Sequence, residues 1–133
     1  MTISFARLRE YLDAIAANPA AMDIAGSPHG PFWRIDHDLF VHSDVPNVLC
    51  TTSPNNPPIP IVVSGDSGAS PLWKILSADR VVCGKRQMPR GGPFATDPGY
   101  SITLASGEVV IGAQILADIA AWITANCPEM GNN

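Results

Sequence analysis

The sequence has few cysteines, and none of them forms a close pair. Cys50, Cys83 and Cys127 make an odd number of thiols, and no two lie within four positions of each other. A C-x-x-C metal or redox motif is therefore excluded. Two alternatives remain: one disulfide with a free third thiol in an oxidising compartment, or three reduced thiols in a reducing one. Cys83 is either half of a disulfide, with Cys50 or Cys127 as its partner, or a thiol activated by the basic residues that follow it.

Positive charge and long apolar runs are also scarce. Eight Lys and Arg residues face twelve Asp and Glu residues, and because phosphates bind basic surfaces, the net charge of −4 predicts no nucleic-acid partner. No apolar run approaches the roughly 20 residues of a membrane span, so none is expected. Residues 1–15 carry charges throughout and resemble no secretory signal, which favours a cytoplasmic protein. The alternative is a periplasmic or secreted protein whose leader has been removed.

The chain lacks internal repeats and any linker long enough to separate two domains. We therefore predict a single domain over residues 1–133. Thirteen prolines and eleven glycines predict long irregular segments between its elements.

Apolar residues at helical spacing predict one helix near each end of the chain. The first helix begins after a cap at Thr2 or Ser4 and ends before Pro19. The last runs over residues 113–126. Two shorter helices are expected, at residues 36–42 and 70–76.

β structure is expected at two places. Two β-branched runs on either side of Ala105–Ser106–Gly107 predict a hairpin between Tyr100 and Ile111. The proline-rich segment Pro54–Pro60 predicts extended, partly polyproline II backbone, followed by a short strand at Ile61–Val63. Helices outnumber strands, so the predicted fold is mainly α.

Several short motifs follow one another in a fixed order over residues 62–128. They are, in sequence, Gly65–Asp66, Ser70–Pro71–Leu72, Met88–Pro89, Gly91–Gly92, Ile119 and Trp122–Ile123. This series resembles the C-terminal half of the small class I cytochrome c domains of bacteria. The resemblance implies a cytochrome c-like helical domain whose first and last helices pack across each other. The β-hairpin is then an insertion before the C-terminal helix.

The same resemblance implies a haem-attachment box, Cys-x-x-Cys-His, after the first helix. Residues 25–29 read Ala-Gly-Ser-Pro-His, so His29 corresponds to the proximal haem ligand and Met88 to the distal one, while both cysteines are missing. Covalent haem needs thiols that add to the porphyrin vinyl groups, and it is therefore excluded. The alternative is haem bound non-covalently through His29 and Met88.

We expect no cofactor and an interior filled by the protein's own side chains. The candidates for this filling are Phe32, Trp33, Leu39, Phe40, Phe94 and the hairpin from Tyr100 to Ile111.

The resemblance implies a haem-free accessory or interaction domain that serves a redox enzyme such as an oxidase, and a binding protein rather than an enzyme. The alternative is an electron carrier with non-covalent haem. Five of the eight basic residues lie between Lys74 and Arg90, beside the Met-Pro motif, where cytochrome-like domains meet redox partners. The predicted partner-binding residues are Phe32, Trp33, Lys85, Arg86 and Arg90.

Two other patterns have simpler interpretations. The stretch SGDSGASP is similar to the nucleophile loop of chymotrypsin-like proteases, with Ser67 as the nucleophile. This chain is too short for two β-barrels, so a turn before the helix at Pro71 is predicted instead, and a small hydrolase is a third alternative. The sulfur and imidazole side chains of the kind that binds copper or zinc are scattered along the chain, so no metal site is predicted. These residues are His29, His37, His42, Cys50 and Met88.

Overall fold

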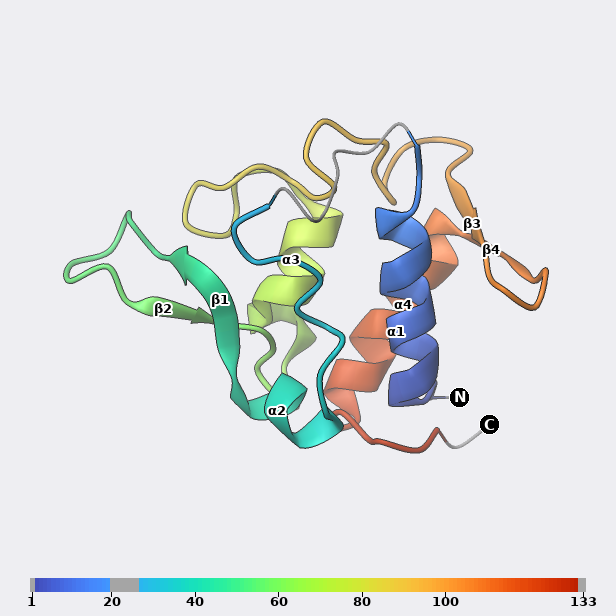
Figure 1. Cartoon of the computed structure of the whole chain (residues 1–133), viewed down its shortest axis with the longest axis horizontal. Coiled ribbons are helices and arrows are strands. Elements are labelled where there is room, and N and C mark those ends of the chain that lie inside the picture. The colour runs from blue at the N-terminus through green and yellow to red at the C-terminus, as the bar shows by residue number, and fades with distance from the viewer. Residues whose placement is uncertain (1, 20–26, 132–133) are drawn as a thin grey trace.

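The structure is a computed structural model that describes residues 2–19 and 27–131. Its elements are, in chain order, α1 (Phe5–Ala16), α2 (His37–His42), β1 (Asp44–Leu49), β2 (Pro58–Pro60), the 3₁₀ turn η2 (Ser67–Ala69), α3 (Pro71–Ser77), β3 (Ser101–Thr103), β4 (Val109–Ile111) and α4 (Gly112–Thr124). Figure 1 shows α1, α3 and α4 at the centre of the molecule. The β1–β2 hairpin projects on one side and the β3–β4 hairpin on the other (Figure 1).

The prediction of a mainly α fold is wrong. The molecule is an α+β fold, 33% helical and 14% strand, with two small antiparallel sheets. The sheet that the sequence did not predict pairs β1 with β2, between residues that include Pro58 and Pro60. Proline cannot donate to a β ladder, but an edge strand can turn the proline nitrogen outward. The proline-rich segment takes part in the pairing as a hydrogen-bond acceptor, because the Pro57 carbonyl accepts a hydrogen bond from the Cys50 N–H at 2.8 Å.

Helix α1 forms where the apolar spacing predicts it. The Ser4 hydroxyl accepts a hydrogen bond from the Arg7 N–H at 3.1 Å and so caps the helix. Its buried face consists of Phe5, Leu8, Tyr11, Leu12 and Ile15.

The expected contact between the first and last helices is present. The rings of Phe5 on α1 and Trp122 on α4 stack with their centroids 6.1 Å apart. At the other end of the contact, the Tyr11 hydroxyl donates to Asp118 Oδ2 at 2.6 Å. Helix α4 buries Ile115, Ile119, Trp122 and Ile123, so this pair of helices forms the centre of the main hydrophobic core.

Helix α3 begins with Pro71, whose missing N–H costs nothing in the first turn. The preceding Ser70 is fully buried, but its hydroxyl accepts from the Val63 N–H at 2.8 Å and donates to the Asp66 carbonyl at 2.9 Å. The Trp73 indole N–H donates to the Leu116 carbonyl at 3.0 Å and holds α3 against α4.

Strands β3 and β4 form the hairpin that the β-branched runs predict. Ile102 pairs with Val110, and both side chains are buried. On the opposite face, Val109 and Ile111 are 61% and 60% exposed. The Arg7 guanidinium donates two hydrogen bonds to the Glu108 carboxylate, at 2.9 and 2.6 Å, and joins this hairpin to α1.

Candidate functional site

His29 lies in a turn that its own ring helps to close. The His29 Nδ1 lies 2.7 Å from the Gly30 carbonyl, which assigns the proton to Nδ1. The ring packs edge-on against Phe32, with centroids 5.2 Å apart. Positions 25 and 26 of the expected haem box lie outside the described residues.

Met88 lies in the loop after α3 and is partly buried against the main core. Its N–H donates to the Ile75 carbonyl at 2.8 Å, which holds the loop against the helix. The backbone of Met88 therefore has a fixed place, and its side chain contributes to core packing.

Aromatic rings fill the interior beside α1 and α4. Phe40 is fully buried, and its ring centroid lies 5.2 Å from Phe5, 6.1 Å from Trp122 and 6.4 Å from Phe32. Of the residues expected to fill the interior, Trp33 and Phe40 are buried and Phe32 packs against the core. The other two, Leu39 and Phe94, do not belong to it, and Leu39 is 52% exposed.

Two of these ring contacts involve the surroundings of His29, the predicted proximal haem ligand. Phe32 packs against the imidazole and stacks on Phe40, so protein rings adjoin the predicted proximal ligand. The haem-ligand roles that the resemblance implies for these two residues thus have no support in the packing.

The other two histidines bind backbone carbonyls. The His37 Nε2 lies 2.6 Å from the Cys127 carbonyl, and the His42 Nδ1 lies 2.9 Å from the Asp38 carbonyl. His37 thereby secures the segment that follows α4. Across residues 2–19 and 27–131, no three His, Cys, Asp or Glu side chains come together as metal ligands.

Trp33 has a structural role that its sequence context does not reveal. Its indole N–H donates to Asp13 Oδ1 at 2.7 Å, and the same oxygen accepts from Arg34 Nε at 3.2 Å. The Trp33 side chain therefore ties the segment before α2 to α1. With 4% of its surface exposed, Trp33 has almost no area to offer a partner, contrary to the prediction.

The loop after α3, residues 79–92, carries four of the basic residues and is called here the basic loop. Its first half is a tight turn in which the Arg80 N–H donates to the Lys85 carbonyl at 2.9 Å. Its second half is held by Gln87, a buried side chain whose amide donates to the Leu76 carbonyl at 3.0 Å and to Thr96 Oγ1 at 2.9 Å. Nothing in the sequence distinguishes this glutamine from a surface residue.

The charges of the basic loop are mostly unneutralised. Arg80 lies 3.7 Å from Asp79. Among the residues that the structure describes, no carboxylate lies within 4.0 Å of the Lys85, Arg86 or Arg90 charge. Arg86 and Arg90 are exposed, and Lys85 is half-buried.

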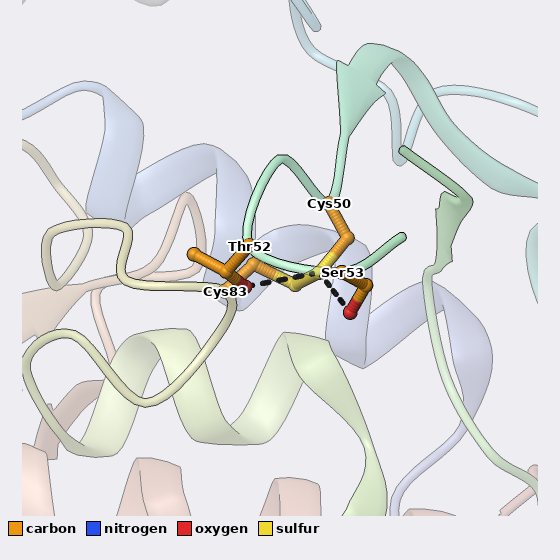
Figure 2. Close-up of a disulfide and its surroundings, with 4 residues drawn as sticks. All are labelled: Cys50, Thr52, Ser53 and Cys83. Atoms are coloured by element: carbon orange, nitrogen blue, oxygen red, sulfur yellow. Dashed lines mark hydrogen bonds between the residues drawn. A yellow bond between two sulfur atoms is a disulfide. The ribbon is translucent and has the colours of Figure 1, made fainter. Parts of the chain in front are cut away.

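A disulfide between Cys50 and Cys83 joins the basic loop to the end of β1 (Figure 2). The structure thus has Cys50, rather than Cys127, as the partner of Cys83, and it has no free thiol at Cys83. Cys127 is free and buried. Burial raises the pKa of its thiol, and a hydrogen bond with Ser64 partly offsets that rise.

Ser67 begins the turn η2, in agreement with the predicted turn before the helix at Pro71. Asp66 Oδ1 accepts from the Ala69 N–H at 3.1 Å and caps this turn. No histidine of the described chain hydrogen-bonds to the Ser67 hydroxyl, so the structure forms no nucleophile–base pair here.

Two pockets open on the surface of the described part of the chain. The larger, about 530 Å³, lies between the β3–β4 hairpin and the start of α4. The smaller, about 290 Å³, lies beside the disulfide.

Comparison with known proteins finds no matching family model, no similar curated protein and no similar solved structure. Over the described residues, the helices are too short or too polar to cross a membrane.

Proposed function

We propose that this chain is a haem-free accessory domain, related to cytochrome c domains, that binds a redox enzyme of the oxidase class. The observation that carries the proposal is the part of the basic loop that holds Lys85, Arg86 and Arg90, because no carboxylate of the described residues lies within 4.0 Å of these three charges.

Electrostatics explains why such a loop suits a protein partner. The whole chain has a net charge of −4, so Lys85, Arg86 and Arg90 form a local positive field on an otherwise acidic molecule. Long-range attraction of this kind steers an acidic surface into one orientation and raises the association rate. Binding also relieves the mutual repulsion of the three cations.

Phe32 supplies the apolar part of the proposed contact. Its ring is half-buried, so it is partly held by the core and partly open. Trp33 is left out of the proposed surface because its ring is buried.

We further propose that the protein is located in an oxidising compartment, either the periplasm or the outside of the cell. The Cys50–Cys83 disulfide supports this alternative over the cytoplasm, because cytosolic thiols are normally kept reduced.

The test compares two triple variants with the same change in net charge. In the first, Lys85→Gln, Arg86→Gln and Arg90→Gln remove three positive charges from the basic loop. In the second, the control, Ser101→Glu, Thr103→Glu and Ala105→Glu add three negative charges at exposed positions of the β3–β4 hairpin. Both variants and the natural chain are cross-linked in native extract, and captured proteins are identified by mass spectrometry.

We expect the natural chain and the hairpin control to capture the same metal- or haem-containing oxidoreductase. The loop variant should capture at least about tenfold less of this oxidoreductase, because three charge contacts are removed. Capture of no oxidoreductase, or equal capture by the loop variant, would contradict the proposal.

A further inference from the structure

Cys50 belongs to a small hydrophobic cluster with Ile59 and Val82, and both cysteines of the disulfide also line a groove. The groove has a volume of about 290 Å³. Its lining includes Cys50, Cys83, Pro58, Lys74 and Val81. Val81 is 45% exposed. A small molecule in this groove therefore lies beside both residues of the disulfide.

The two halves of the disulfide differ in exposure. Cys50 is buried, with 8% of its surface exposed, whereas Cys83 is only half-buried. Cys83 also precedes Lys85 and Arg86, whose charges attract an incoming anion. A thiolate that enters the groove thus reaches the Cys83 sulfur more readily than the Cys50 sulfur.

The hydroxyl groups of two neighbouring side chains approach the sulfur of Cys50, the buried half of the disulfide. Thr52 Oγ1 and Ser53 Oγ each lie 3.5 Å from Cys50 Sγ, and Figure 2 shows both approaching the same sulfur. A disulfide sulfur has no proton, so the two hydroxyls donate these hydrogen bonds. The disulfide sulfur is a weak acceptor. A thiolate is a strong acceptor, so the same two contacts strengthen when negative charge develops on Cys50.

We propose that Cys50–Cys83 is a thiol-exchange site whose substrate is a dithiol. One thiolate of the dithiol attacks Cys83 Sγ, a new S–S bond forms, and the Cys50–Cys83 bond breaks. The electron pair of the broken bond remains on Cys50, where the Thr52 and Ser53 hydroxyls stabilise it until the sulfur takes a proton from solvent. Exchange is faster when the leaving thiolate is stabilised in this way.

The second thiol of the dithiol completes the reaction. It attacks the dithiol sulfur of the mixed disulfide and releases Cys83 as a thiolate, which is then protonated. The dithiol is oxidised to a disulfide, and the chain gains two electrons and two protons. The exchange removes the covalent link between the basic loop and β1, and it does not depend on the proposed binding function.

The first experiment measures how fast the folded chain is reduced by dithiothreitol, with free thiols counted by alkylation and mass spectrometry. The double variant Thr52→Val, Ser53→Ala loses both hydroxyls. The matched control is Thr51→Val, which changes the neighbouring exposed threonine of the same turn. We expect the double variant to be reduced about tenfold more slowly and the control to react like the natural chain. Equal rates in the double variant and the natural chain would overturn the proposal.

The second experiment needs no variant and therefore does not depend on how a variant folds. The natural chain is exposed to excess reduced glutathione, acid-quenched and digested, and the mixed disulfide is located by peptide mass spectrometry. We expect glutathione on Cys83. Glutathione on Cys50, or reduction that occurs only at the rate of global unfolding, would contradict the assignment.

Discussion

At the scale of single residues, the two buried tyrosines differ in what their hydroxyls contact. Tyr11 donates to Asp118 and accepts from Arg7 Nε at 3.2 Å, so its hydroxyl is fully engaged. The Tyr100 hydroxyl is buried and has no hydrogen-bond partner among the described residues. A buried polar group without a partner costs free energy that an apolar ring does not.

Replacing Tyr100 with Phe should therefore raise the free energy of unfolding, by about 1 kcal/mol. Tyr11→Phe removes the same atom from a ring of the same size, but it breaks the bond to Asp118 and should lower the stability. Urea unfolding of the two variants measures the contrast. A loss of stability in Tyr100→Phe equal to that in Tyr11→Phe would show that both hydroxyls have partners.

The stability should also fall at alkaline pH. Burial, together with the hydrogen bond to Asp118, raises the pKa of Tyr11 from 10.0 to about 12. The folded state then keeps its proton where the unfolded state loses it, so this contribution is complete below pH 10.0 and is lost as the pH rises to about 12. Burial also raises the pKa of Tyr100.

Unfolding free energies measured across this range should decrease in the natural chain. They should decrease less steeply in Tyr11→Phe, and less still when Tyr100 is replaced as well. Three parallel curves would mean that neither tyrosine titrates differently on folding.

At the scale of elements, the sequence predicted those elements whose signals are local. Helix α1 has its cap at Ser4, α3 has proline in its first turn, and the β3–β4 hairpin follows from two β-branched runs around Gly107. The β1–β2 hairpin was missed because its second strand is Pro58–Pro60, and proline is normally depleted in strands. Its pairing depends on distant backbone contacts that no local pattern encodes.

The start of α4 packs closely against the backbone of the segment before β3. A Cβ at Gly112 would overlap the Ala95 carbonyl oxygen, which belongs to the segment before β3. Gly112→Ala should therefore destabilise the protein by about 1–3 kcal/mol, as overpacking does. Gly68→Ala is the matched control, since a Cβ there meets only Asp66 Oδ1 at 3.6 Å. Thermal unfolding compares the two, and equal melting temperatures would contradict the packing.

At the scale of the whole molecule, charge was the part of the candidate site that the sequence revealed. The cluster of basic residues from Lys74 to Arg90 can be recognised from the sequence alone. Three other features depend on tertiary contacts. The Gln87 side chain is buried and donates to the Leu76 carbonyl, the Trp33 indole N–H donates to Asp13, and Cys83 pairs with Cys50 at a separation of 33 residues. A three-cysteine chain allows several pairings, and only the fold selects one.

The central claim is that the chain binds no haem and that its own aromatic side chains, which pack beside α1 and α4, fill the interior. The most direct measurement is the visible absorption spectrum of the full chain after incubation with ferric haem and gel filtration, alongside His29→Ala and Met88→Leu. Protein that elutes without a Soret band, or with a weak band that is the same in both variants, is the predicted result. A strong Soret band that co-elutes with the natural chain and disappears in His29→Ala would contradict the account.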